Sequence, residues 1–245
     1  MTKSTPEKTI AEHQVITEAF TELAPEYQSL MDKELRQYWG IGYREFVSQL
    51  VQTILVNPGE MILDIATGTA VIPLEIRGAN QRQDPIVGLD ITPAMLRQAR
   101  QVLLQRGSTH SIRLVCASAM AMPFKDGSFN VAVCGLGTHH MNVPQMLAEA
   151  SRVLVAGGRL IITDVCASPF WRSVWGKILL RILLIQYGLL RRSVRAQAEI
   201  HAFRNVRTAE EWRRLLIESG FSKIEMRESQ ARRPWYPSAL TLKAE

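Results

Sequence analysis

The sequence predicts an α/β fold in which a mostly parallel sheet of seven strands carries helices on both faces. Short apolar runs alternate with segments of helical periodicity from residue 57 onward, which is typical of parallel strands joined by helices. Turn residues separate the two kinds of segment, as at Pro58-Gly59 and Gly157-Gly158. With 245 residues, of which 47% are hydrophobic, the chain is long enough for one elaborated domain with a sizeable core.

The N-terminal part is expected to be helical. Residues 1–10 are expected to be disordered, whereas apolar residues fall at helical spacing from 11 to 56. The spacing holds for Phe20, Leu23, Tyr27, Leu30 and Met31, and again for Phe46, Leu50, Val51 and Ile54. Pro58-Gly59 then closes this segment as a turn.

The alternation that follows gives five strands and the helices between them. The strands are predicted at Met61–Ile65, Ile86–Asp90, Ile112–Cys116, Val131–Cys134 and Arg159–Val165. Helices are predicted near Val71–Arg77, from Thr92-Pro93 to Gly107, and near Val143–Leu154. Residues 123–128 are predicted to form a loop.

The pattern breaks at Pro169 and resumes at Thr208, so residues 169–206 are an insertion after the fifth strand. A capping box at Thr208–Glu211 begins a last helix, and Phe221–Arg227 and Ala239–Leu242 are predicted as the last two strands, in a hairpin. Ligand sites of open α/β sheets lie beyond the carboxyl ends of the strands. An insertion at this place is therefore well placed to be a lid.

The insertion is basic and amphipathic. The chain has a net charge of +6, and the stretch 165–198 holds no acid but six cations: Arg172, Lys177, Arg181, Arg191, Arg192 and Arg195. Its apolar run is too short and too charged to span a bilayer, which takes about 20 apolar residues. Four interpretations stay open for residues 170–195: a roof over a lipophilic substrate, a peripheral membrane contact, packing on the protein's own core, or packing on a second subunit.

A small-residue turn and two acids indicate a nucleoside site. The apolar run that ends in Asp64 turns through Ala66–Ala70 into a predicted helix, and Asp90 ends the next apolar run. The backbone of such a turn can approach a ligand closely, and the second carboxylate can accept hydrogen bonds from ribose hydroxyls. This arrangement predicts a site for an adenosine-containing cofactor.

The three cysteines are far apart and show no metal-binding spacing. Each lies in or just after an apolar run, so Cys116, Cys134 and Cys166 are expected to be buried, reduced thiols. No secretory signal is recognised at the N-terminus. We expect a cytoplasmic protein without a metal site.

The segments Ile62–Ala70, Val87–Met95, Ala117–Phe129 and Arg152–Leu160 resemble the class I methyltransferases that use S-adenosylmethionine. Within them the chain is most similar to the ubiquinone/menaquinone C-methyltransferase-like (methyltransferase type 11) branch, whose N-terminal gate resembles Phe20 and Ala24–Tyr27. The resemblance implies a Rossmann-like sheet. It divides the chain into an N-terminal helical gate or cap (1–56), a cofactor-binding core (57–168), a helical substrate lid (169–206), and a C-terminal helix and strands that complete the core (207–245).

The resemblance also implies roles for single residues. Asp64 and the turn of Ala66, Thr67, Gly68 and Ala70 would hold the methionine end of S-adenosylmethionine, and Asp90 would bind its ribose. The adenine would lie between Ile91 and Met95 and against Ser118, Ala119 and Met120, with Leu136 near the donor methyl group. Three positions depart from the family pattern: Ala70 replaces a loop glycine, Ser118 replaces an acid beside the adenine amine, and Asn130 replaces an aspartate.

The candidate catalytic residues follow the fourth strand. His139 and His140 lie on the loop that faces the cofactor, and one of them is the candidate base or acceptor-orienting group. Tyr27 is the candidate for closing over the cofactor. Asp164, at the end of the fifth strand, is a weaker candidate for orienting the acceptor. His201 and Tyr187, in the insertion, are weaker candidates for pointing into a pocket.

The predicted function is methyl transfer from S-adenosylmethionine, with S-adenosylhomocysteine as product, to carbon or oxygen of a small, lipophilic acceptor such as a quinone, phenol or natural product. One alternative is an RNA methyltransferase, although the Asn- or Asp-Pro-Pro-aromatic run of amino-methylating enzymes is absent after the fourth strand, where Cys134–Thr138 stand. Another is a methyltransferase fold repurposed for cyclisation or binding. The sequence leaves the oligomeric state and the acceptor open.

Overall fold

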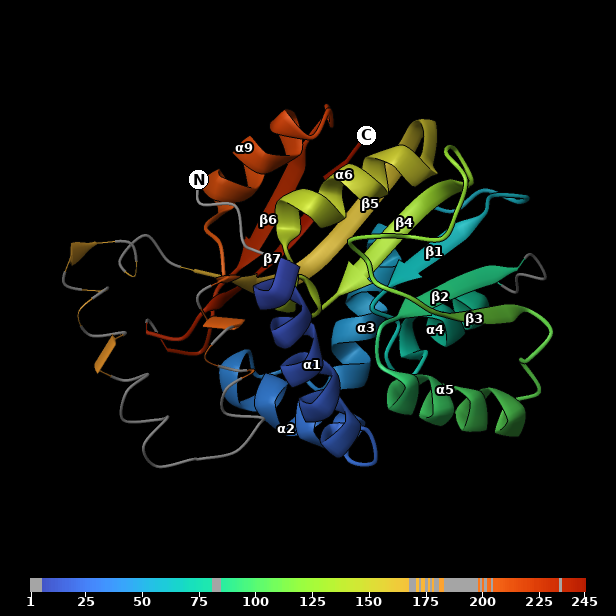
Figure 1. Ribbon diagram of the computed structural model, residues 1–245, viewed down its shortest axis with the longest axis horizontal. Coiled ribbons are helices and arrows are strands. Elements are labelled where there is room, and N and C mark those ends of the chain that lie inside the picture. The colour runs from blue at the N-terminus through green and yellow to red at the C-terminus, as the bar shows by residue number, and fades with distance from the viewer. Residues whose placement is uncertain are drawn as a thin grey trace.

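The computed structural model describes residues 6–80, 85–167, 205–233 and 235–245, together with scattered residues between 171 and 203. A seven-stranded sheet runs through it in the order β3-β2-β1-β4-β5-β7-β6 (Figure 1). The strands are β1 (Ile62–Ile65), β2 (Ile86–Asp90), β3 (Ile112–Cys116), β4 (Phe129–Gly135), β5 (Leu154–Cys166), β6 (Glu225–Ser229) and β7 (Ser238–Ala244). The first five are parallel, and β7 is antiparallel to both β5 and β6. The predicted sheet and its terminal hairpin are confirmed.

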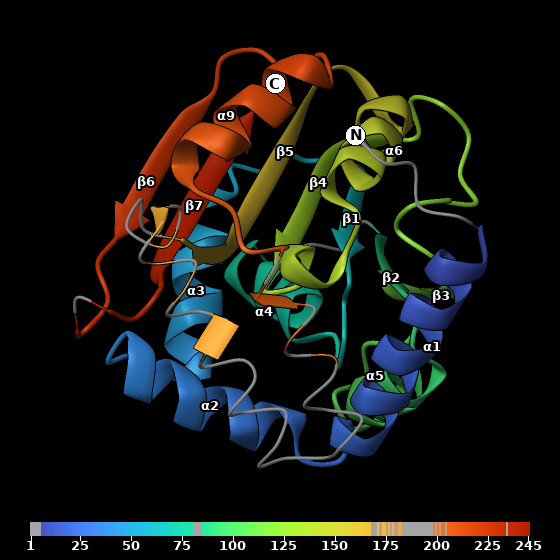
Figure 2. The same ribbon diagram turned by 60° about the vertical axis from the view of Figure 1, so that its left-hand side comes forward.

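Helices cover both faces of the sheet. They are α1 (Pro6–Leu23), α2 (Tyr27–Tyr38), α3 (Tyr43–Thr53), α4 (Val71–Asn80), α5 (Pro93–Gln105), α6 (Val143–Val153) and α9 (Ala209–Glu218), with a short 3-10 helix, η1 (Thr138–His140). The helices α6 and α9 pack on one face through Met146, Leu147 and Trp212, and Figure 2 shows them side by side. The helices α3, α4 and α5 pack on the other face. All four residues of β1 are therefore buried, as expected for a central parallel strand.

The N-terminal helices reach the carboxyl ends of the strands. A small apolar cluster joins α1 and α2 to the start of α5, through Ala24, Tyr27, Ala94 and Met95. The predicted helical segment therefore breaks into three helices. It also begins earlier than expected: α1 starts at Pro6, and the expectation of disorder over residues 1–10 is wrong for 6–10, where Pro6 begins the helix.

Two further boundaries differ from the sequence prediction. Gly157-Gly158 lies inside β5 rather than in a turn before it. The pairing of β4 with β5 shifts register at this point: Phe129 pairs with Leu154, whereas Val131, two residues later, pairs with Arg159. The strand accommodates this bulge because Gly157 has a φ of +75°, which glycine adopts without steric cost. The sixth strand begins at Glu225 rather than Phe221, whose ring is buried in the core.

The insertion 169–206 lies largely outside the described residues, so the lid remains a prediction. His201 and Tyr187 are likewise outside them. Within the described part of the chain, no helix is both long and apolar enough to cross a membrane. Of the three thiols, Cys134 and Cys166 are buried as expected, but the prediction is wrong for Cys116, which is exposed because β3 is the edge strand of the sheet.

Candidate active site

A cavity opens at the carboxyl ends of β1, β2 and β4, with an empty volume of about 710 Å³ that includes space open to solvent. Nine of the predicted cofactor residues line it: Ala66, Gly68, Asp90, Ile91, Met95, Ser118, Ala119, Met120 and Leu136. The same cavity is also lined by residues of the N-terminal helices and of the η1 region: Ile16, Phe20, Tyr27, His140 and Met141. Residues distant in sequence thus meet at the edge where the sequence predicted a ligand.

The turn after β1 is held by backbone hydrogen bonds. The Thr67 N–H donates to the Leu89 carbonyl over 2.9 Å, and the Ala70 N–H donates to the Thr67 carbonyl over 2.9 Å. Ala66, Gly68 and Ala70 all have left-handed φ angles, of 57°, 53° and 60°. For alanine this conformation costs about 1–2 kcal/mol, so two positions of the turn are strained. Ala70 is fully buried and Ala66 lies on the cavity wall.

Asp90 joins this turn to β2. Its carboxylate accepts the Gly68 N–H over 2.9 Å and the Thr92 N–H over 2.8 Å, one at each oxygen. A carboxylate offers about four acceptor sites, so each oxygen can take a further hydrogen bond from a ligand. Burial raises the pKa of Asp90, while the two backbone donors oppose that shift. The geometry fits the two adjacent hydroxyls of a ribose.

Asp64 lies behind the turn rather than on the cavity wall. Both of its carboxylate oxygens are buried, and within the described residues neither accepts a hydrogen bond of ordinary geometry, although the Thr67 side chain partly opposes the effect of burial on the pKa. Burial raises the pKa of Asp64 to about 8. A buried carboxylate without partners is costly unless a ligand supplies a cation or donors. A cationic ligand group that reached Asp64 would hold its carboxylate ionised, which is the chemistry that an ammonium end would supply.

The wall formed by residues 117–120 follows β3. The Ser118 hydroxyl accepts the Met120 N–H over 3.2 Å, and the Ala121 N–H donates to the Ser118 carbonyl over 3.1 Å. Ser118, which stands where the family pattern has an acid, therefore stabilises the turn of residues 118–121 through both its hydroxyl and its carbonyl. Ile91 and Met95, predicted to contact the adenine, line the same cavity.

The two histidines of η1 have different surroundings. His139 Nδ1 lies 2.6 Å from Asp164 Oδ1, and the same carboxylate accepts both the backbone N–H and the hydroxyl of Thr138. These contacts hold the pKa of Asp164 below its ordinary value although the group is buried. His139 and Asp164 thus form a dyad, and His139 does not line the cavity.

His140 does line the cavity. Its ring meets Phe20 edge to face at 4.9 Å between centroids, and burial holds its pKa well below the usual value, so the ring is neutral. Its Nδ1 is buried and has no hydrogen-bond partner among the described residues. A ligand in the cavity would find an unused polar atom here.

An aromatic group closes the cavity from the N-terminal side. Tyr27 lies between Phe20 and Tyr43, with ring centroids 6.2 and 6.1 Å apart. Burial raises the pKa of Tyr27 well above its ordinary value, so the phenol stays protonated and can donate but not act as a base. Sequence reasoning did not assign Ile16 and Met141 to the site. Ile16 is four residues before Phe20, and this helical spacing is the signal that could have found it.

Within the described residues, no group of three His, Cys, Asp or Glu side chains is placed to hold a metal ion. Thr67 and Ala70 belong to the turn but, like Asp64 and His139, stand behind the cavity wall. The predicted cofactor residues, Tyr27 and the two histidines of η1 therefore line this cavity or stand within two residues of one that does, whereas His201 and Tyr187 lie outside the described residues.

A seven-stranded sheet in the order β3-β2-β1-β4-β5-β7-β6, with an antiparallel β7 and acids near the ends of β1 and β2, is the fold of the class I methyltransferases. The chain belongs to the ubiE/COQ5 methyltransferase family, whose model matches residues 8–228. S-adenosylmethionine is the cofactor of this family, as the sequence predicted.

Among curated relatives, the chain is 30% identical over 162 residues to a demethylmenaquinone methyltransferase of Symbiobacterium thermophilum, covering 66% of this chain and 62% of that protein. It is 30% identical over 167 residues to a ubiquinone/menaquinone biosynthesis C-methyltransferase of Geobacter sp. strain M21, covering 67% and 69%. The chain thus spans less than two thirds of the length of the first of these relatives.

Solved structures share the fold at low identity. The [4+2]-cyclase SpnF has a TM-score of 0.70 at 16% identity, with 96% of each chain covered. The geranyl diphosphate C-methyltransferase of Streptomyces coelicolor has a TM-score of 0.61 at 13% identity, with 82% of this chain and 77% of that one covered. These likenesses support the fold and say nothing about the acceptor.

Proposed function

We propose that this protein transfers a methyl group from S-adenosylmethionine to a ring carbon of a small, lipophilic quinol-type acceptor. The observation that carries the proposal is the single cavity that brings Asp90 and the turn after β1 together with an apolar and aromatic wall containing His140. The quinone specificity comes from the names of the relatives, which include a C-methyltransferase. S-adenosylmethionine would supply an electrophilic methyl group on a sulfonium.

The residues of this chain would supply orientation and a base. Removing a hydroxyl proton from a quinol makes its ring carbon nucleophilic, and the ring proton leaves after the methyl group has been accepted. We assign the base to His139, because the buried, ionised Asp164 at 2.6 Å stabilises the protonated imidazole. His139 stands behind the cavity wall, but its side chain is 16% exposed and its ring centroid lies 4.2 Å from that of His140, so the acceptor would have to enter beside His140 to reach it. A carboxylate at Nδ1 also fixes the ring orientation and tautomer, as in other catalytic dyads.

His140 and Tyr27 would then shape the acceptor side. The buried Nδ1 of the neutral His140 ring would form a hydrogen bond with a polar group of the acceptor. The protonated Tyr27 covers the cavity together with Phe20, which excludes water from the reacting atoms.

The test is transfer of labelled methyl from S-adenosylmethionine to a demethylmenaquinol with a short isoprenoid tail. We expect D164N to lower kcat by about a hundredfold or more, in the range of general-base catalysis, with cofactor affinity within about twofold of the wild type. The matched control D126N changes an exposed carboxylate and should leave the rate unchanged. Absence of transfer by a wild-type protein that binds the cofactor would reject the quinol acceptor and favour a repurposed fold.

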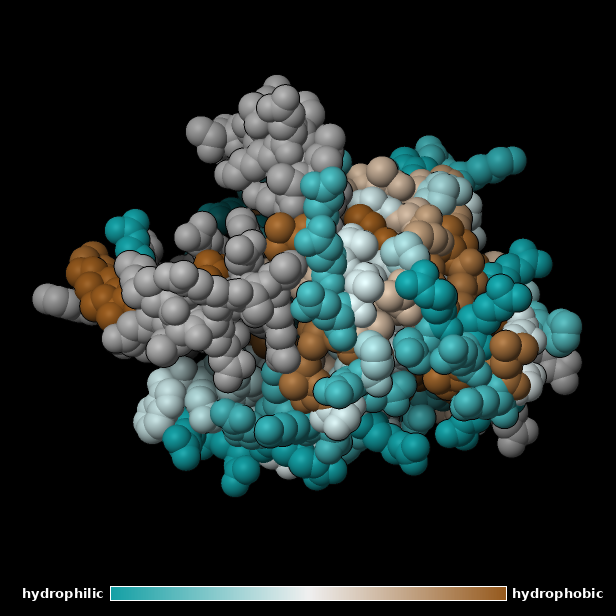
Figure 3. Space-filling model, turned by 60° about the horizontal axis from the view of Figure 1, so that its bottom comes forward, coloured by the Kyte–Doolittle hydropathy of each residue, from teal (hydrophilic) through white to brown (hydrophobic). Residues whose placement is uncertain are grey.

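We also propose that the protein works in the cytoplasm and takes its acceptor from the surface of an anionic membrane. Val174, Ile178 and Ile182 are 71%, 45% and 48% exposed, and their spacing of four residues is that of one helix face. Figure 3 shows apolar atoms at the edge of the molecule where Figure 1 draws the described pieces of this segment. The acid-free, basic stretch 165–198 suits anionic lipid.

Sedimentation with vesicles tests this contact. We expect binding to vesicles containing phosphatidylglycerol but not to pure phosphatidylcholine, and loss of binding in the triple variant V174S/I178S/I182S. The control I217S removes a similarly exposed isoleucine, 61% exposed on α9, and should bind like the wild type. Equal binding by the triple variant would reject the proposed surface.

A further inference from the structure

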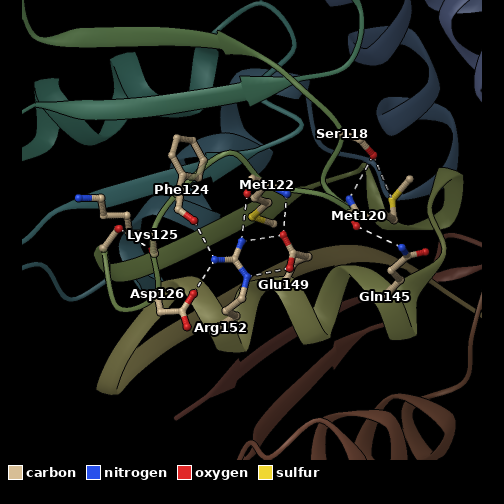
Figure 4. Close-up of polar contacts among 10 residues, drawn as sticks. Ser118, Met120, Met122, Phe124, Lys125, Asp126, Gln145, Glu149 and Arg152 are labelled. Carbon is tan, nitrogen blue, oxygen red and sulfur yellow. Dashed lines mark hydrogen bonds and ion pairs between the residues drawn. The ribbon is translucent and has the colours of Figure 1, made fainter.

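Arg152 uses all five of its N–H groups, three on one loop and two on Glu149 of its own helix (Figure 4). Its Nη1 donates to the Phe124 carbonyl over 2.7 Å and to Asp126 over 2.8 Å. Its Nη2 donates to the Met122 carbonyl over 3.0 Å, and Nη2 and Nε together grip the Glu149 carboxylate, each over 2.8 Å. A guanidinium has five donors, so none is left unused.

Two more side chains of α6 grip the same loop. Glu149 accepts the Met122 N–H over 2.6 Å, and the Gln145 amide donates to the Met120 carbonyl over 3.2 Å. Gln145, Glu149 and Arg152 are four and three residues apart, which places them on one face of the helix. Figure 4 shows this face turned toward the loop. The backbone is therefore held at every second residue from Met120 to Phe124.

The held loop continues into the cavity wall. Residues 117–128 form no helix or strand, so their backbone depends on contacts with other elements. On the β2 side, the Ala117 N–H donates to the Asp90 carbonyl over 3.0 Å. On the α6 side, the three side chains fix Met120 and Met122, two to four residues from Ser118. The wall predicted to contact the adenine is thus hydrogen-bonded to β2 at one end and to α6 at the other.

The contacts with Arg152 are of unequal strength. Asp126 has a side chain that is 81% exposed, and such surface ion pairs contribute little. Glu149 is 19% exposed and is held by both fork nitrogens, and this bonding lowers its pKa. The two backbone carbonyls need a planar donor with several N–H groups at fixed angles. A lysine, with a single ammonium group, cannot reproduce that pattern.

We propose that Arg152, with Glu149, is a positioning residue that sets the adenine side of the cofactor cavity. It touches neither the cavity nor the reacting atoms and acts through the loop 118–126. This inference rests on the proposed function, because the ligand it serves is S-adenosylmethionine or its product.

The test is calorimetric titration of S-adenosylhomocysteine and of adenosine, together with amide hydrogen exchange, on full-length R152K. We expect affinity for both ligands to fall by about tenfold, a loss of about 1.4 kcal/mol. The loss should be equal for the two ligands, because the defect lies on the adenine side that they share. Amide exchange should become faster at residues 118–126 and stay unchanged at the turn 66–70.

D126N is the matched control, since it removes only the exposed partner, and its affinity should stay within about twofold of the wild type. E149Q keeps the size of the side chain and should weaken binding like R152K. A purely structural role would lower the thermal midpoint of R152K without changing either affinity, and that result would overturn the inference alone. If the wild type binds neither ligand, the proposed function fails and the inference fails with it.

Discussion

The two sides of the cavity are built differently. The side proposed for the cofactor is formed by a backbone turn and by a carboxylate, each near the end of one of two adjacent strands. Hydrogen bonds such as that from the Gly68 N–H to Asp90, over 2.9 Å, join them. The acceptor side is side chains from three separate places, namely Ile16 and Phe20 of α1, Tyr27 of α2 and His140 of η1. The first side is fixed by the sheet. The second depends on how helices pack.

The largest effect is expected from removing the acid of the cofactor side. D90A should weaken S-adenosylmethionine binding by about a hundredfold or more, because two hydrogen bonds to a charged group are lost, each worth about 1.5–3 kcal/mol. Calorimetric titration measures this, with the thermal midpoint as a check on folding. Binding at wild-type affinity would show that Asp90 does not hold the ribose.

A smaller and more selective effect is expected on the acceptor side. H140F keeps the edge-to-face contact with Phe20 but removes Nδ1, which lies buried and unpartnered. We expect the rate with a demethylmenaquinol to fall by about tenfold, the value of one hydrogen bond to the acceptor, while cofactor affinity stays within about twofold. A matching loss of cofactor affinity would show that the two sides are not independent.

Asp64 allows a test through stability. Its pKa is about 8 in the folded protein and about 3.8 in a free side chain, so the folded state binds the proton more tightly. The stability that this protonated group contributes is fully present below pH 4 and is lost as pH rises through about 8. D64N should therefore unfold at a higher temperature than the wild type, by an amount that grows between about pH 4 and pH 8.

The same variant should lose cofactor binding, since it removes the negative charge that the ammonium group needs. Thermal melts of both proteins from pH 4 to pH 9, with titration of the cofactor at pH 8, measure the two effects. A D64N protein that is less stable at pH 8 would contradict the account of a buried, unpartnered carboxylate.

The smallest effect is expected at the strained turn. A66G relieves a left-handed φ of 57°, at a cost of about 1–2 kcal/mol for alanine, but adds about 0.5–1 kcal/mol of backbone entropy to the unfolded chain. We expect a gain in the free energy of unfolding of less than about 1 kcal/mol. Urea denaturation measures it, with A66V, which adds a branched side chain to the same backbone, expected to destabilise.

Local pattern was enough to predict the strands, the turn and both acids. Apolar runs that end in Asp64 and Asp90 place those carboxylates at one edge, because parallel strands end at the same edge of a sheet. The capping box at Thr208 and Glu211 was equally readable, since both hydrogen bonds are local. Where the pattern was ambiguous, as at the two glycines inside β5, a bulge took the place of a turn.

The sequence by itself determined the fold class, because strands and their ends follow from patterns a few residues long, and its resemblance to a known family gave the cofactor. The order of the strands came from the structure. Only the tertiary structure decided which histidine pairs with Asp164, 25 residues away, and which faces the cavity. It also decided that Arg152 holds a loop 26 to 30 residues before it. These contacts join separate elements of secondary structure. Sequence periodicity reports the face of one element at a time, so it cannot predict which residues of two elements come into contact when they pack.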